Sequence, residues 1–212
     1  MSVIVAVKDK KTGEITIGCD SQVSCGNLKS SLKDNGFSKI WNYDLEGYTI
    51  IGGVGSLRDI QLIQTDDSLI TQEDLILKGI DYRFVVRDFF TRIYETLKTY
   101  NRLTVSEQGV VAPIINSKFI LVHNDNAWVI DMDGSVTEID DYLVLGSGEE
   151  VAIGVLENNK NKKPKQRIEE AIKACADTTL YVNSKIVYMK AKQKVNLKSL
   201  LKVIQSSIEQ SK

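Results

Sequence analysis

Apolar residues follow two spacings along this chain, and short continuous runs come first. Residues 3–7 and 15–19 are apolar runs on either side of the turn-rich residues 9–13, so they predict a hairpin of two buried strands. Residues 39–43 and 48–51 predict a second hairpin around a turn at 44–47. The sequence therefore begins with four strands.

Helical spacing comes next, and the order of the elements predicts the fold. Ser56 and Asp59 have capping-box spacing, and residues 82–101 carry apolar side chains at helical intervals. Strand patterns follow at 119–123, 127–131, 136–139 and 142–145, then helices at 149–157 and from Pro164, then a strand at 185–189. These blocks predict an α+β fold in one domain, 1–212: a four-layer αββα sandwich with helices outside two sheets.

The end of the chain predicts one more helix. Apolar residues between 197 and 208 share one helical stripe, so residues 193–212 are expected to form a C-terminal helical extension. Packing on its own domain and docking on a neighbouring subunit are both compatible with that stripe.

Composition and charge argue against several classes of function. The chain has 27 basic and 28 acidic residues, so it lacks the positive field that drives nucleic-acid binding. No apolar run is long enough to cross a membrane or to form a signal peptide, which indicates a cytoplasmic protein. Three cysteines without metal-ligand spacing and one histidine argue against a metal site, and no cofactor motif is present.

Two further motifs are ambiguous. The glycine cluster at 51–56 lacks the residues of a phosphate-binding loop, so it is either a turn or a place where a backbone N–H approaches a reacting carbonyl. The basic stretch at 160–167 joins two predicted helices. A solvated loop is the default interpretation of that stretch, and anion or partner binding is the alternative.

Ser2, Asp20 and Lys39 can carry chemistry without histidine. Asp20 ends an apolar strand and Lys39 begins another, so both charges lie at the edge of a core. If Met1 is removed, the α-amine of Ser2 lies within reach of its own hydroxyl and is basic enough to accept its proton. The three residues together would provide an activated nucleophile with a positioned base.

Six short motifs, in order, resemble the proteasome β-subunit and HslV-type family of N-terminal-nucleophile (Ntn) hydrolases, from residue 2 to about 190. They are Ser2-Val-Ile-Val-Ala-Val, Gly18-Cys-Asp-Ser-Gln-Val-Ser, Ser38-Lys-Ile, Ile51-Gly-Gly-Val-Gly with Asp59 downstream, Leu145-Gly-Ser-Gly, and Ala176-Asp preceding Leu180-Tyr-Val. Most members of the family have threonine where this chain has Ser2.

The resemblance implies a role for each matching position. It implies Ser2 as nucleophile with its α-amine as base, Asp20 and Lys39 as the pair that polarises the hydroxyl, and the Gly52 N–H as oxyanion donor. Ser147 and Asp177 match supporting residues near the amine. The substrate-binding positions are Ser24, whose backbone would pair with an extended peptide, and the pocket residues Val23, Ile50 and Val54.

The resemblance also implies an assembly and an activity. We expect a ring of six or seven identical subunits, possible stacking of rings, hydrolysis of unfolded polypeptides, and feeding by an AAA+ unfoldase. Removal of Met1 is expected to be the only processing needed. A catalytically silent ring or scaffold subunit is the alternative, and an Ntn amidase acting on a small molecule is a third class.

Overall fold

The computed structural model describes residues 2–25, 28–31, 38–103 and 114–193. The predicted helical extension at 193–212 therefore lies almost entirely outside the described residues, and so does Met1. No helix in the described part of the chain is long and apolar enough to cross a membrane.

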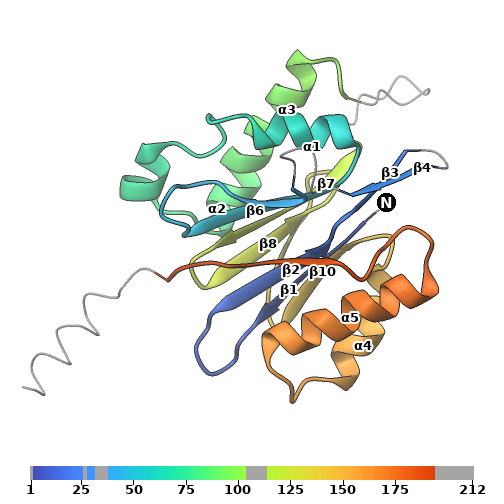
Figure 1. Cartoon of the computed structure of the whole chain (residues 1–212). Helices are drawn as coiled ribbons and strands as arrows, with labels where there is room; N and C mark the ends of the chain where they lie inside the picture. Colours follow the sequence, from blue (N-terminus) through green and yellow to red (C-terminus); the bar gives the residue numbers. More distant parts are fainter. Residues whose placement is uncertain (1, 26–27, 32–37, 104–113, 194–212) are drawn as a thin grey trace, which may run out of the picture.

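Two antiparallel sheets lie face to face at the centre of the molecule (Figure 1). One has four strands in the order β10-β1-β2-β11: Tyr142–Gly146, Val3–Lys8, Ile15–Asp20 and Ile186–Lys190. The other has five strands in the order β5-β6-β7-β8-β9: Ile40–Asn42, Thr49–Gly55, Ser117–His123, Asn126–Ile130 and Val136–Glu138. A short hairpin, β3 (Gln22–Cys25) and β4 (Leu28–Ser31), extends from the end of β2.

Helices cover the outer face of each sheet, which completes four layers (Figure 1). The five-stranded sheet packs against α1 (Leu57–Gln64), α2 (Tyr82–Phe84), the π-helical segment η3 (Val85–Phe89) and α3 (Phe90–Thr99). The four-stranded sheet packs against α4 (Glu149–Asn158) and α5 (Pro164–Thr178). The predicted four-layer sandwich is confirmed.

Strand β1 shows why its sequence is apolar at every position. Ile4 and Ala6 belong to the core between the two sheets, whereas Val3, Val5 and Val7 belong to the core beneath α4 and α5. Side chains alternate across a strand, so a strand between two cores needs an apolar residue at every position. This buried strand holds Ser2 at one end of the sandwich.

Several elements differ from their predicted bounds. Strand β6 continues through the glycine cluster to Gly55, whereas the sequence pattern predicts that it ends at residue 51. The predicted helix at 82–101 is present over 82–99, but its second turn is a π-helical segment. The β3–β4 hairpin and a π-helical turn η2 (Asp74–Lys78) have no counterpart in the sequence prediction.

Candidate functional site

Asp20 is the centre of the candidate site. It is the last residue of β2, its side chain is completely buried, and its carboxylate accepts three hydrogen bonds from described residues. The backbone N–H of Val3 donates to Oδ1 at 2.9 Å and that of Gln22 to Oδ2 at 3.0 Å, while Lys39 Nζ donates to Oδ1 at 2.6 Å. One carboxylate therefore joins the start of β1, the end of β2 and the residue before β5.

Lys39 has its charged end inside the protein. Only 2% of the residue is exposed, and Asp20 is its ion-pair partner. Burial lowers the pKa of the Lys39 ammonium from its ordinary value, and the Asp20 carboxylate opposes that shift. Because the ammonium and the Val3 N–H share one carboxylate oxygen, the positive charge lies next to the peptide that joins residues 2 and 3.

Ser2 is held through its main chain. The residue is 9% exposed, and its carbonyl oxygen accepts the Ser147 N–H at 2.9 Å and the Ser147 hydroxyl at 3.4 Å. Gly146 passes directly behind that carbonyl with φ of +107°, where a Cβ would lie 1.9 Å from the Ser2 oxygen. The turn after β10 thus brings Ser147 to Ser2, and only glycine fits beside it.

Gly52 lies next to Lys39, but the ladder directs its N–H away from that residue. The Gly53 N–H donates to the Lys39 carbonyl at 2.9 Å, and residues of an antiparallel strand direct their N–H groups to alternate sides. The Gly52 N–H is therefore directed toward Ile120 of β7. Gly52 can act as oxyanion donor only if this amide leaves its ladder position, so that role stays a prediction.

The other candidate residues lie in different environments. Asp177 is exposed near the end of α5, and Val23 of β3 is partly exposed. Ile50 is completely buried and Val54 is 5% exposed in the core between the sheets, so neither offers much surface to a substrate in this conformation. The backbone of Ser24 pairs with Lys29, and its side chain lies outside the described part. These roles stay predictions.

Sequence reasoning missed Asn183, which fixes the segment after Asp20. Its side-chain Oδ1 accepts the Ser21 N–H at 3.2 Å and the Ser21 hydroxyl at 3.3 Å. The Gln22 side-chain amide also donates to the Leu180 carbonyl at 3.1 Å. The loop before β11 is thereby tied to the residues beside the site. The only signal in the sequence is a cluster of turn-forming residues in front of the last strand.

Cys19, beside Asp20, is not a competing nucleophile. Its side chain is completely buried, and burial raises the pKa of the thiol to about 12. A thiol attacks as the thiolate, so Cys19 is inert near neutral pH. Within the described ranges no three His, Cys, Asp or Glu side chains are grouped to hold a metal ion.

Comparisons with known proteins agree with this architecture. A family model described as proteasome subunit matches residues 2–194. The proteasome subunit beta of Nanoarchaeum equitans (strain Kin4-M) is 27% identical over 175 residues, which are 82% of this chain and 80% of that protein.

Two solved structures share the fold. BPH of Thiobacillus denitrificans in complex with epoxomicin superposes with a TM-score of 0.69 at 14% identity, covering 91% of this chain and 100% of that chain. HslV from Trypanosoma brucei superposes with a TM-score of 0.58 at 17% identity, covering 90% and 99%. This chain thus has the same fold as these two proteins. Because the family model spans nearly all of the sequence, this chain belongs to the proteasome subunit family.

Proposed function

We propose that this chain is a ring-forming peptidase subunit in which Ser2, once Met1 is removed, attacks the peptide bonds of unfolded polypeptides. The observation that carries the proposal is the buried ion pair between Lys39 and Asp20, whose shared oxygen also binds the amide next to Ser2. Members of the family are generally Ntn peptidases, which supports this reading over a small-molecule amidase.

The proposed reaction uses groups of this chain and one water molecule. The Ser2 hydroxyl oxygen attacks the scissile carbonyl carbon, and its proton passes to the Ser2 α-amine. The carbon–nitrogen bond then breaks, the α-ammonium returns a proton to the leaving amine, and an ester on Ser2 remains. Water hydrolyses that ester and restores the hydroxyl. Lys39 is proposed to stabilise negative charge on the serine oxygen, because a buried ammonium acts strongly in a site with little water.

The substrate in this proposal is an extended chain. Ser24 on β3 is the candidate position for main-chain pairing, so a polypeptide would add to the sheet as a strand. Such a site accepts many sequences, which suits a chamber that degrades unfolded proteins. We propose a homo-oligomeric ring of six or seven subunits, as the family resemblance implies, that receives chains from an AAA+ unfoldase.

The test combines mass measurement with a covalent probe. Purified assembly is incubated with an epoxyketone peptide, the class of inhibitor that epoxomicin represents, and the adduct is located by peptide mapping. We expect loss of Met1 and one adduct on the Ser2 peptide. Ser2→Ala should abolish both adduct and peptide turnover, Ser2→Thr should keep both, and Ser68→Ala, on an exposed serine of another loop, should change neither.

Three results would overturn the proposal: Met1 retained in active material, full turnover by Ser2→Ala, or a monomer in solution by native mass spectrometry. Processed Ser2 that gives neither adduct nor turnover in an intact ring would instead identify a catalytically silent subunit.

A further inference from the structure

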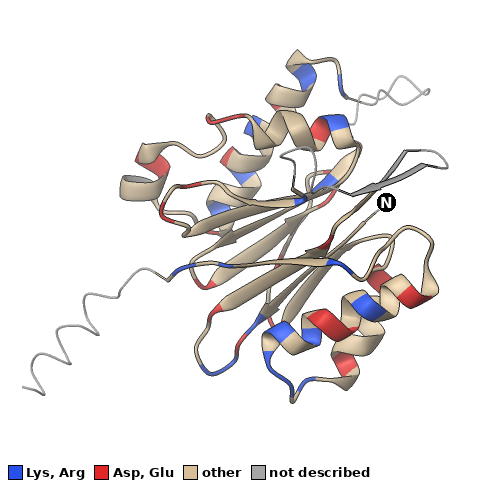
Figure 2. Cartoon of the chain, viewed as in Figure 1, with Lys and Arg blue, Asp and Glu red and all other residues tan. Residues whose placement is uncertain are grey.

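A cavity of about 510 Å³ lies at the end of the β1–β2 hairpin, beside the loop that joins α4 and α5. The hairpin contributes Lys8, Lys10 and Lys11 to its lining, and the loop contributes Lys160, Lys162 and Lys163. Figure 2 shows these two basic segments next to each other at the lower edge of the molecule. The whole chain has a net charge of −1, so this cavity concentrates positive charge that the rest of the molecule lacks.

The acidic groups in the lining are already bound within the protein. Both Asp141 oxygens accept hydrogen bonds from Arg167 at 2.9 Å, and Arg167 itself is only 3% exposed. Asp9 accepts the backbone N–H groups of Lys11 and Thr12 at 2.8 and 3.2 Å. Asp141 also lies 3.9 Å from Lys10, so these two carboxylates offset only part of the charge of the seven cations that line the cavity.

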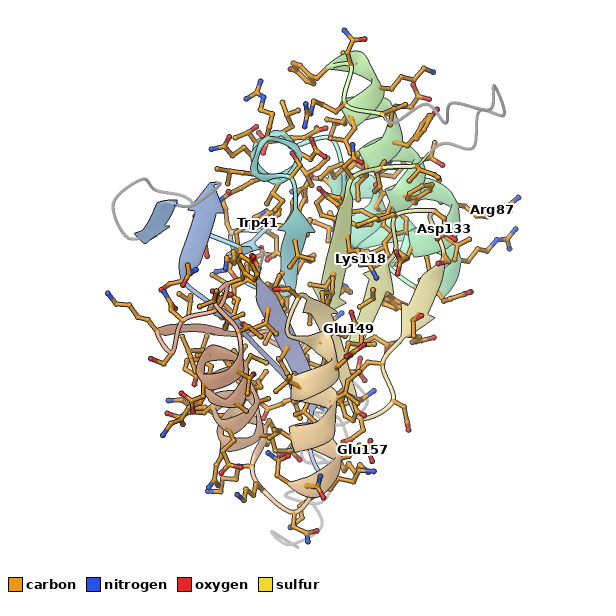
Figure 3. All side chains as sticks on the ribbon, turned by 90° about the vertical axis from the view of Figure 1, so that its right-hand side faces the viewer. Trp41, Arg87, Lys118, Asp133, Glu149 and Glu157 are labelled. Carbon is orange, nitrogen blue, oxygen red and sulfur yellow. The ribbon has the colours of Figure 1, made fainter. Side chains whose placement is uncertain are left out.

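Part of the positive charge has no counterpart. Glu157, at the lower end of α4 in Figure 3, binds Lys160 at 2.5 Å, and Glu170 binds Lys162 at 2.7 Å. Lys10 and Arg167 are paired with Asp141, which leaves Lys8, Lys11 and Lys163. Among the described residues, no carboxylate lies within ion-pair distance of these three lysines. Uncompensated lysines around one cavity attract an anionic ligand.

The lining decides what kind of anion fits. None of the described lining side chains is aromatic, so a nucleotide base has no surface on which to stack. Arg167 carries the one guanidinium in the lining, and both of its Nη atoms already donate to Asp141. It is therefore not available for bidentate binding of a phosphate group. What remains is a set of flexible ammonium groups, which pair well with several separate carboxylates. We propose that this cavity docks an Asp- and Glu-rich polypeptide segment of another protein.

The cavity lies at the opposite end of β1 from Ser2. Strand β1 begins beside the candidate site at Val3 and ends at Lys8 in the cavity lining, and Asp141 precedes β10 while Gly146 ends it. Six residues of strand separate the two ends by roughly 20 Å. A segment bound here leaves Ser2 accessible, so the inference does not depend on the proposed peptidase activity.

The test is binding of a fluorescein-labelled oligoglutamate peptide to the full-length assembly, followed by fluorescence anisotropy. We expect Lys11→Glu/Lys163→Glu to weaken binding about tenfold or more, because it places carboxylates against carboxylates. The control, Arg83→Glu/Arg87→Glu, makes the same change in net charge on exposed residues of the opposite helix layer, where Figure 3 labels Arg87. This control should bind within about twofold of the unmodified protein, since surface charges beyond about 10 Å are screened.

Two outcomes would overturn the proposal. An equal loss of affinity in both double variants would mean that net charge alone attracts the peptide. Tripolyphosphate or an RNA oligomer binding more tightly than oligoglutamate at the same ionic strength would assign the cavity to phosphate instead.

Discussion

Replacing Lys39 by methionine tests how much the buried ion pair contributes to folding stability. Methionine keeps much of the apolar stem and removes the ammonium, so the completely buried Asp20 carboxylate loses its 2.6 Å partner. The amides of Val3 and Gln22 still donate to that carboxylate. The substitution therefore leaves a buried charge partly satisfied rather than isolated.

The size of the effect follows from this geometry. Removing one partner of a buried ion pair costs about 3–5 kcal/mol of folding stability. The Asp20 carboxylate keeps its hydrogen bonds from the Val3 and Gln22 N–H groups, so we expect Lys39→Met to cost about 3 kcal/mol, near the lower end of that range. In a protein of this length each kcal/mol shifts the melting temperature by about 2–4 °C, so we expect a decrease of about 6–12 °C.

Urea titration and calorimetry at matched subunit concentration measure this difference, because assembly also stabilises the folded chain. Lys98→Met is the control, since its ion pair with Glu95 is half-exposed on α3 and should change stability by less than about 0.5 kcal/mol. A loss below about 1 kcal/mol in Lys39→Met would refute the reasoning.

Two further predictions concern the same site. Burial lowers the pKa of Lys39 from 10.5, so the unfolded chain binds more protons than the folded chain just below that pH. The free energy of unfolding should therefore rise as pH increases toward 10.5, because the neutral amine costs less to bury and still donates a hydrogen bond to Asp20, which methionine cannot do. Urea titrations of Lys39→Met should lack this rise. Gly146→Ala places a methyl group 1.9 Å from the Ser2 oxygen and should cost about 2 kcal/mol or more, whereas Gly154→Ala on α4, with nothing within 4 Å, should be neutral or stabilising. Equal melting temperatures for these two alanine variants would contradict the second prediction.

The sequence predicts most of the fold because its strands and helices have strong periodicities. Strand β1 is apolar at every position, which requires a core on both sides and so indicates stacked layers. The β3–β4 hairpin has no such pattern. Its residues are mostly polar, so its sequence has no apolar alternation with a period of two.

The site is harder to predict than the fold because its contacts join distant segments through main-chain atoms. Asp20 and Lys39 were identifiable as charges at the ends of apolar strands, but the Val3 N–H that completes the group has no side-chain signature. Asn183 reaches Ser21 across 162 positions of sequence, and a single polar residue in a loop does not indicate its partner. The direction of the Gly52 N–H depends on strand register, which the glycine cluster itself does not specify.

Asp20 and Lys39 are part of both the fold and the candidate site. The same Asp20 oxygen that binds the ammonium also anchors the first amide of β1, so losing either charge would loosen the strand that carries Ser2. The pair therefore links the stability of β1 to the position of the candidate nucleophile. The atoms that distinguish a peptidase from a silent subunit are the hydroxyl and the free α-amine of residue 2. Modification of those two atoms, rather than the conformation around them, is the decisive measurement.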